Sequence, residues 1–319
     1  MPNALDDPFS TRFRLNLERL LDRPVKPDDR FGIAVSGGPD SMALLTVSHF
    51  ALPGQVEAAT VNHGFRLQAA DEAAMVAQWC LERGIPHATL SPPAPITGNL
   101  QSAARKERYC LLWQWCEQRG LDWLMTAHHA DDQLETLLMR LNRGSGVAGL
   151  AGVRERSDRL LRPLLSWRRA ELAQIVEQTG CPYVEDPSNA DARFDRVAMR
   201  MHLQQTDWLD SVSASRSAAA LAEAEIALNW VIKGLCSQHL QQAGEEIRLD
   251  RTDFPREIQR RLLLHMLTRL DPELVPRGDT LDQALVQLGL GKKYTIGSLL
   301  LQGGDIWTVK PAPLRRGQG

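Results

Sequence analysis

The stretch that decides the fold is Phe31-Gly32-Ile33-Ala34-Val35-Ser36-Gly37-Gly38-Pro39-Asp40-Ser41. Its first five residues form a short apolar run, which is typical of a buried strand. The run stops at two glycines and a proline, and residues 41–49 follow with a helical pattern. Glycines allow a tight turn that brings backbone N–H groups close to a ligand, and the N-terminus of the next helix adds partial positive charge. The sequence therefore predicts a strand, a phosphate-binding loop and a helix, in that order.

Short apolar runs and longer helical stretches alternate around this segment, from residue 30 to residue 127. Further strands are predicted at 56–61, 87–90 and 121–126, and helices at 69–83 and 103–119. Strands separated by helices of this length pair in parallel through right-handed crossovers. We therefore expect an α/β fold with a doubly wound, mainly parallel sheet.

The pattern changes beyond about residue 206. Residues 213–239 and 257–270 have the spacing of amphipathic helices, and strand-like pieces follow at 294–301 and 306–309. We expect two domains. Residues 1–210 would carry the sheet, and residues 211–319 would form a smaller, mainly helical C-terminal domain.

The composition of the 319 residues limits the class of protein. Hydrophobic residues make up 43% of the chain and the formal net charge is −2, so the charge by itself favours no class of partner. No stretch is apolar for long enough to span a bilayer, and the first residues lack the apolar core of a signal peptide. The five cysteines form no C-x-x-C pair, which argues against a disulfide framework or a zinc site. We expect a cytoplasmic protein with reduced, buried thiols and no membrane partner.

The loop also indicates which phosphate chemistry it serves. Ser36 and Ser41 can donate hydroxyl hydrogen bonds, and Asp40 can hold a Mg²⁺ ion that bridges phosphates. No lysine follows the glycines, so this is not a Walker A loop. The loop fits a site that grips pyrophosphate as a leaving group while the α-phosphorus of a nucleotide is attacked.

A second polar cluster, residues 126–136, contains two histidines and three acids and follows the predicted strand 121–126. Open α/β sheets bind ligands at the carboxyl ends of their strands. Asp132 and Glu135 are three residues apart and share one face of the predicted helix. Asp131 is expected to be the N-cap of that helix. We expect the cluster as a whole to serve a function beyond capping.

Arginines gather in a third region. Arg193, Arg196 and Arg200 recur at i, i+3 and i+7 and would form one cationic stripe on a helix. Six more arginines lie between residues 154 and 169. The excess of arginine over lysine favours phosphate recognition, whereas a solvated surface with ion pairs is the alternative.

In order and spacing, these motifs resemble those of the N-type ATP pyrophosphatases and, as a full set, those of the tRNA(Ile)-lysidine synthase family. The resemblance covers about residues 30–200. It rests on residues 36–41 and 128–136 and on the segments Val61-Asn62-His63-Gly64-Phe65-Arg66, Ala104-Arg105, Arg108-Tyr109, Arg143-Gly144-Ser145-Gly146, Arg162-Pro163-Leu164-Leu165 and Glu185-Asp186-Pro187-Ser188-Asn189. One departure is Val197, which stands where the family often has Asn.

The resemblance implies a role for each motif. ATP with Mg²⁺ would bind at the loop residues Ser36, Gly37, Gly38, Pro39, Asp40 and Ser41, with adenine near Asn62 and His63. Asp40 and Asp132 would be metal ligands. Asp132 and Glu135 would handle the metal or a lysine amine, with His128 beside them as a further catalytic residue. Arg196 or Arg200 would meet the α-phosphate or the tRNA.

The implied activity is that of an AMP-forming carbon–nitrogen ligase. It would convert the wobble cytidine (C34) of the isoleucine tRNA with a CAU anticodon to lysidine, using ATP and L-lysine. The base would first be adenylated, and AMP and pyrophosphate would be released. Two alternatives stay open: a tRNA thiolation enzyme of the same superfamily, and a non-catalytic nucleotide- or tRNA-binding module. A homodimer and tRNA contacts of the C-terminal domain are also left open.

Overall fold

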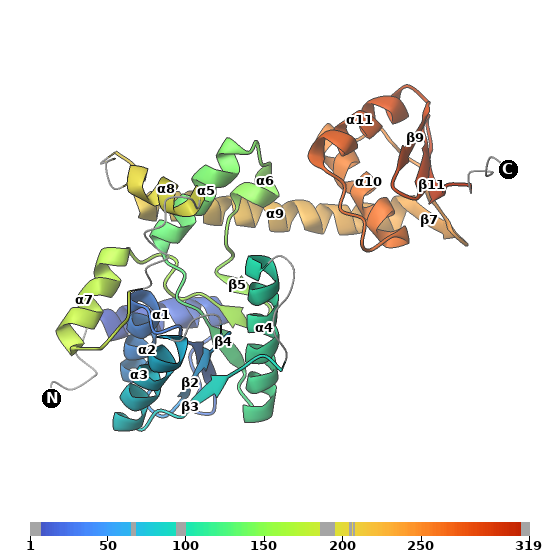
Figure 1. Cartoon of the computed structure of the whole chain (residues 1–319). Helices are drawn as coiled ribbons and strands as arrows, with labels where there is room; N and C mark the ends of the chain where they lie inside the picture. Colours follow the sequence, from blue (N-terminus) through green and yellow to red (C-terminus); the bar gives the residue numbers. More distant parts are fainter. Residues whose placement is uncertain are drawn as a thin grey trace. The chain divides into compact units, whose positions relative to one another are not determined.

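The computed structural model describes residues 8–64, 68–93, 100–185, 195–203, 206 and 208–313, without the side chains of residues 68, 100–102 and 195–197 (Figure 1). The chain divides into two compact units, Met1–Ala222 and Glu223–Gly319. This division falls within helix α9 (Ser211–His239), whereas the boundary expected after residue 210 lies at the start of this helix. Helix α9 therefore contributes residues to both units.

A six-stranded sheet lies in the first unit, in the order β3-β2-β1-β4-β6-β5. All neighbouring strands are parallel except β5 and β6, which are antiparallel. The strands are β1 (Phe31–Ala34), β2 (Val56–Val61), β3 (His87–Leu90), β4 (Trp123–Met125), β5 (Arg156–Ser157) and β6 (Leu160–Leu161). The predicted mainly parallel sheet is confirmed, and its four predicted strands correspond to β1–β4.

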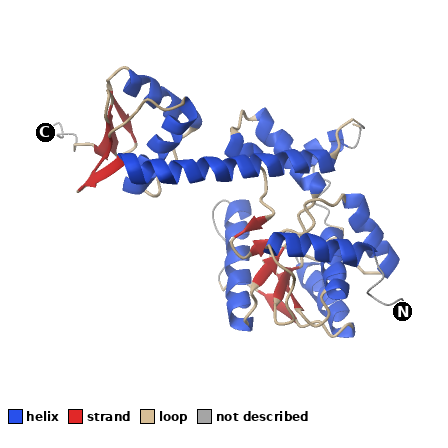
Figure 2. Cartoon of the chain, turned by 180° about the vertical axis from the view of Figure 1, so that it is seen from behind, coloured by secondary structure: helices blue, strands red, loops and turns tan. Residues whose placement is uncertain are grey.

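Helices cover both faces of this sheet (Figure 1 and Figure 2). Phe31 and Ile33 of β1 join one core with side chains of α1 (Pro8–Leu21), α2 (Pro39–Ala51), α3 (Gln68–Glu82) and α7 (Arg169–Thr179). On the other face, α4 (Leu100–Arg119) packs so closely that a Cβ on Gly32 would lie 2.7 Å from the Trp115 ring. The three helices predicted between residues 30 and 127 correspond to α2, α3 and α4. Helices α1 and α7 lie outside the segment whose alternation predicts the fold.

The direction of the chain across the sheet reverses at β1. From β1 the chain moves outward to β2 and β3, and then returns to β4 on the other side of β1. Open α/β sheets bind ligands in the crevice outside the carboxyl ends of the strands at such a point. The loop before α2 and the loop before α5 (Ala130–Asn142) both leave this edge. The first unit also contains α6 (Val147–Leu150) and α8 (Asp195–Leu203).

The second unit contains the end of α9, helices α10 (Arg256–Leu270) and α11 (Gly278–Gly289), and an antiparallel sheet in the order β7-β8-β11-β10-β9. Its strands are β7 (Leu240–Ala243), β8 (Glu246–Leu249), β9 (Lys293–Ile296), β10 (Leu299–Gln302) and β11 (Trp307–Pro311). Helical residues outnumber strand residues, and the predicted helices and strand pieces are confirmed. Helix α11 and the hairpin of β7 and β8 are additions to the prediction. The sequence of β7 does not alternate between apolar and polar residues. Across the described residues of both units, no helix is long and apolar enough to cross a membrane.

The cysteines are buried to different degrees. Cys80, Cys116 and Cys181 are buried, Cys236 is half-buried and Cys110 is exposed. Burial raises the pKa of the Cys80 and Cys116 thiols to about 12, so both stay protonated at neutral pH. The prediction of buried thiols is therefore confirmed for three cysteines and wrong for Cys110, which lies on the outer side of α4.

Candidate active site

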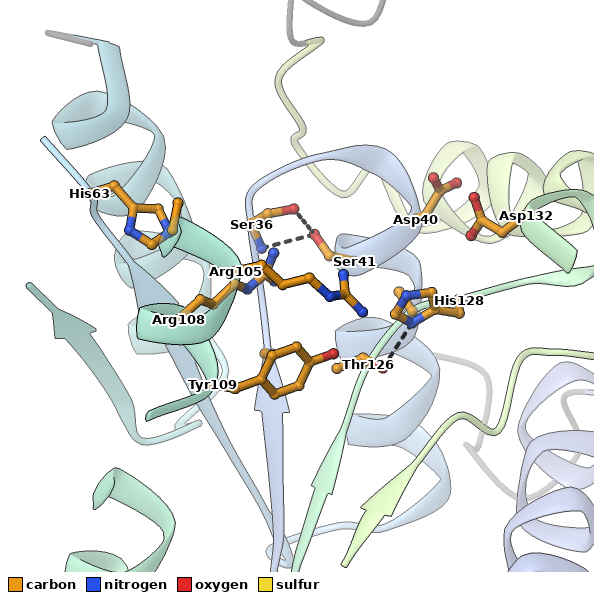
Figure 3. Close-up of a pocket in the computed structure, with 13 residues that line it drawn as sticks. Ser36, Asp40, Ser41, His63, Arg105, Arg108, Tyr109, Thr126, His128 and Asp132 are labelled. Carbon is orange, nitrogen blue, oxygen red and sulfur yellow. Dashed lines mark hydrogen bonds between the residues drawn. The ribbon is translucent and has the colours of Figure 1, made fainter. Parts of the chain in front are cut away.

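The loop between β1 and α2 borders a cavity at the carboxyl edge of the sheet (Figure 3). Ser41 Oγ accepts a hydrogen bond from the Ser36 N–H at 3.1 Å and donates one to the Gly38 carbonyl at 2.9 Å. Gly37 has a φ of +83°, a left-handed conformation that favours glycine. Pro39 begins α2, where its missing N–H would have had no partner in the helix. The loop is therefore held in shape at a helix N-terminus, where anions bind.

The cavity has a volume of about 420 Å³ and collects side chains from several segments of the first unit. Six of the predicted site residues line it: Ser36, Asp40, Ser41, His63, His128 and Asp132. Gly37, Gly38 and Pro39 shape the loop through their backbone. Asn62 closes a turn, because its Oδ1 accepts the Gly64 N–H at 2.9 Å. The structure thus brings the two main sequence motifs to one place.

Helix α4 adds a wall to the cavity whose residues are not among the predicted site residues. Arg105, Arg108 and Tyr109 line the cavity, and the Arg105 guanidinium lies 5.4 Å from the centre of the Tyr109 ring (Figure 3). Burial lowers the pKa of Arg108, and the charge of Arg105 acts in the same direction. The sequence contains a signal for this wall. Arg108 and Tyr109 follow Arg105 by three and four positions, so the three side chains share one face of the helix. Two cations therefore line the same cavity as the loop of residues 36–41.

Two residues that follow β4 are held at the cavity wall by hydrogen bonds. Thr126 Oγ1 and His128 Nδ1 lie 3.0 Å apart, which orients the histidine ring. Asp132 Oδ2 accepts the His129 N–H at 3.2 Å, as an acid in the first turn of α5 can do. Asp132 is therefore both a helix-capping residue and a cavity residue.

A buried histidine, His129, lies between three carboxylates. It is 2% exposed, and its Nε2 is 3.5 Å from Oδ2 of Asp40 and 3.5 Å from Oδ2 of Asp132. Its Nδ1 is 3.5 Å from Oδ2 of Asp131. Burial lowers the pKa of His129, but Asp131 and Asp40 outweigh it and raise the pKa to about 10. Burial likewise disfavours the Asp40 carboxylate, yet the His129 cation holds the pKa of that carboxyl below its usual range.

Asp131 is not the N-cap of α5, and that prediction is wrong. The N-cap residue is His129, because the helix begins at Ala130 and already includes Asp131. The Asp131 carboxylate instead accepts the Arg169 N–H at 2.8 Å, at the first residue of α7. Asp131 therefore links the N-termini of α5 and α7.

Glu135 lines a second cavity of about 320 Å³ rather than the first. Glu135 is 2% exposed, and its carboxylate accepts two hydrogen bonds from the Arg200 guanidinium, at 2.7 and 3.2 Å. The second cavity is also lined by the charged residues Asp131, Arg168, Arg169, Arg200 and Asp210. The two acids that the sequence places on one helix face, Asp132 and Glu135, thus line neighbouring cavities.

The arginine stripe is described only in part. Arg193 lies outside the described residues, as does the side chain of Arg196, whose backbone belongs to α8. Arg200, on the same helix, binds Glu135. Upstream, three arginines donate hydrogen bonds to backbone carbonyls of the first unit: Arg156, Arg159 and Arg162. For these three, the structure favours an internal role over phosphate recognition.

Comparison with known proteins agrees with this geometry. Residues 9–206 match the family described as the PP-loop domain. The chain is 39% identical over 316 residues to tRNA(Ile)-lysidine synthase of Zymomonas mobilis, and this alignment covers 95% of this chain and 94% of the relative. It is 42% identical over 318 residues to tRNA(Ile)-lysidine synthase of Novosphingobium aromaticivorans, and this alignment covers 96% of this chain and 95% of the relative.

A solved structure shares the fold at lower identity. The U34-tRNA thiolase NcsA from Methanococcus maripaludis, described with its 4Fe-4S cluster, aligns with a TM-score of 0.55 and 19% identity. The alignment covers 67% of this chain and 79% of that chain, and at this identity it shows the fold alone. The sequence relatives are much more similar and match nearly from end to end. The chain therefore belongs to the tRNA(Ile)-lysidine synthase family of PP-loop proteins.

Proposed function

We propose that this chain is an AMP-forming ligase that converts the wobble cytidine, C34, of the CAU-anticodon isoleucine tRNA to lysidine. It would use ATP and L-lysine, pass through an adenylated tRNA, and release AMP and pyrophosphate. One observation carries this proposal: a phosphate-binding loop, two carboxylates and two arginines meet in a single cavity where the sheet reverses its direction. Membership of the family supports the reaction. The first cavity contains residues suited to ATP and Mg²⁺, and the second contains residues suited to lysine.

Residues 36–41 would hold the β- and γ-phosphates of ATP. The N-terminus of α2 attracts negative charge, and the Ser36 hydroxyl adds a hydrogen-bond donor. Without a Walker A lysine, the loop is suited to let pyrophosphate leave as a unit while the α-phosphorus is attacked. His63 lines the same cavity after the end of β2 and would lie beside adenine, with Asn62 next to it.

Mg²⁺ fits this cavity as a companion of ATP. Mg²⁺ binds through one or two carboxylates and completes its shell with water and phosphate oxygens. Asp40 and Asp132 offer two carboxylates that both lie 3.5 Å from His129 Nε2. Within the described part of the chain, no group of three or more His, Cys, Asp or Glu side chains could hold a metal by itself. When bound, Mg²⁺ would stabilise the negative charge that develops on pyrophosphate.

The tRNA base must be activated before lysine can react with it. The C2 oxygen of cytosine is a poor leaving group, and transfer of AMP to that oxygen makes it a good one. Arg105 and Arg108 would stabilise negative charge around the α-phosphate during this transfer, and Arg196 is a further candidate for the same role. The base would be splayed out of the anticodon stack to enter the cavity, as specific RNA recognition usually requires.

The second cavity is suited to the lysine substrate. Lysine needs an anionic partner for its amines and a cationic partner for its carboxylate, and Glu135 and Arg168 line the same space. The ε-amine must lose a proton before it attacks C2, and a nearby carboxylate can accept that proton. Glu135 would bind the amine and accept its proton from the second cavity, whereas Asp132, with His128 beside it, would act on the amine or the metal from the neighbouring first cavity.

The alternatives are less well supported by the site. A thiolation enzyme needs reactive or cluster-binding cysteines, whereas three of the five cysteines here are buried thiols and none forms a C-x-x-C pair. A non-catalytic module has no need of a carboxylate pair beside its phosphate loop. We place the enzyme in the cytoplasm with its tRNA substrate. A homodimer is a hypothesis that light scattering would test.

The experiment that tests the mechanism uses ATP labelled at the α-phosphate. With lysine withheld, we expect label on the tRNA, and added lysine should discharge it as AMP while lysidine forms. The matched control is the same tRNA with uridine at position 34, which should acquire no label. Label that appears on lysine and never on RNA would overturn the proposed order of steps.

A further inference from the structure

We propose that His129 is a positioning residue that sets the direction of the Asp40 and Asp132 carboxylates in the ATP cavity. The proposal rests on the function proposed above, because it concerns how that same site holds Mg²⁺ with ATP. His129 lies behind the cavity wall, since its side chain is 2% exposed while both carboxylates line the cavity. It would therefore act through the two acids and not by touching the substrate.

The placement of Nε2 carries the argument. Asp40 belongs to α2 and Asp132 to α5, and the His129 Nε2 is 3.5 Å from one oxygen of each. Two carboxylates so close to one point repel each other unless a donor lies between them. The ring thus joins two acids that come from helices far apart in the chain. It keeps both of them directed at the space where Mg²⁺ would bind.

The main chain fixes the position of the ring. His129 is the N-cap of α5, and its N–H donates to Asp132 Oδ2 at 3.2 Å. The following N–H, of Ala130, donates to the Trp167 carbonyl at 2.8 Å. These contacts hold the Cα of His129, and because the side chain is 2% exposed, packing around the ring limits its rotation away from the acids.

The two ring nitrogens have separable tasks. Nε2 faces the two cavity acids, whereas Nδ1 faces Asp131, whose carboxylate accepts the N–H of Arg169 at the start of α7. Both His129 and Asp131 belong to the start of α5, and it is Asp131 that links α5 to α7, so the Nδ1 contact lies within one helix start and would serve stability alone. A purely structural histidine would therefore depend on Nδ1, and a positioning histidine on Nε2.

Two amide substitutions separate these tasks. A glutamine amide nitrogen reaches the place of the imidazole Nε2, and its two N–H groups can serve both Asp40 and Asp132. An asparagine amide nitrogen reaches only the place of Nδ1, beside Asp131. His129→Gln and His129→Asn are therefore matched variants of similar polarity, and His129→Ala removes both contacts.

The measurement is the binding of ATP to the full-length protein by calorimetry, with Mg²⁺ varied and with EDTA as the reference, alongside melting temperature. We expect His129→Asn and His129→Ala to weaken the apparent Mg²⁺ affinity about 10–100-fold, as loss of a group that orients metal ligands commonly does. His129→Gln should stay within about threefold of wild type. ATP binding in EDTA should change little in any variant. Equal Mg²⁺ affinity in the Gln and Asn variants, or loss in the Gln variant alone, would overturn the proposal.

A further variant covers the case in which His129→Asn and His129→Ala fail to fold. Asp131→Asn removes the charge that faces Nδ1 and leaves Nε2 in place, so it should lower the melting temperature and keep Mg²⁺ affinity near wild type. If Asp131→Asn lowers Mg²⁺ affinity as well, the positioning role is refuted. Wild-type protein that binds ATP without any dependence on Mg²⁺ would instead refute the proposed metal site, which is a separate failure.

Discussion

Two buried carboxylates in the first unit, Glu135 and Glu57, have similar surroundings and different positions. Each is 2% exposed, and each accepts hydrogen bonds from arginine: Glu135 from Arg200, and Glu57 from Arg119 and Arg30. Glu57 lies at the amino end of β2, whereas Glu135 lies in the helix that follows the carboxyl end of β4 and lines a cavity. Burial and ion pairing are therefore poor indicators of a site, and the edge of the sheet is a better one.

Helix α4 connects the two regions and shows the same contrast in its arginines. Arg105 and Arg108, near its start, line the cavity in which we propose that ATP binds. Arg119, its last residue, binds Glu57 at 2.8 and 3.3 Å. One helix thus carries arginines suited to a phosphate and an arginine that stabilises the fold. The same residue type takes a role that depends on which end of the parallel strands it reaches.

The largest effect should come from Asp40→Asn. We expect kcat for lysidine formation to fall about 10²–10³-fold, because the substitution removes a charge that would act on the leaving pyrophosphate through Mg²⁺. The matched control is Asp29→Asn. Asp29 is a buried aspartate at the other edge of the sheet, and its Oδ2 accepts a hydrogen bond from Arg23 at 2.8 Å. Steady-state kinetics should show near-normal turnover for the control. Equal losses in the two variants would remove the distinction between the edges.

An intermediate effect should separate Glu135→Gln from Glu57→Gln. Glu135→Gln should lower kcat/KM for lysine about 10–100-fold, because it removes the charge that would bind the amine and accept its proton. Glu57→Gln should leave kcat and KM near wild type and lower the free energy of unfolding by about 1–3 kcal/mol, because hydrogen bonds to a charged group are lost. Lysine titrations and urea denaturation measure the two quantities. A Glu57 variant with impaired kinetics at full stability would contradict this division.

The smallest effect concerns the reactivity of the two thiols of α4. Their labelling tests how this helix, which runs between the two edges of the sheet, is packed. Iodoacetamide reacts with thiolates, and burial raises the pKa of Cys116 to about 12, so its thiolate forms only as the pH approaches that value. We expect peptide mapping to find label on the exposed Cys110 at neutral pH and on Cys116 only after denaturation. Catalytic turnover should change little in the labelled protein. Equal labelling of both cysteines in the folded state would show that α4 is not packed as described.

Local pattern determined the fold of the first unit. Residues 31–41 and the alternation that follows predict the four strands β1–β4 and their connecting helices, because parallel strands buried on both faces are mostly apolar. The glycine loop could also be recognised locally, since Gly37 needs a positive φ and Pro39 suits the first turn of a helix. The amino acids alone were thus sufficient to predict the conformation of the glycine loop and the edge of the sheet that it borders.

Only the tertiary structure decided how the charged side chains are shared among cavities. Spacing puts Asp132 and Glu135 on one face of α5, yet they line separate cavities, because Arg200 of α8 holds Glu135. Likewise His129 became a central residue only when α2 brought Asp40 to its ring. Periodicity and turn-forming residues act over a few neighbouring positions, so they can be recognised directly in the sequence. Contacts between helices far apart in the chain depend on how whole elements pack, which no short stretch of sequence contains.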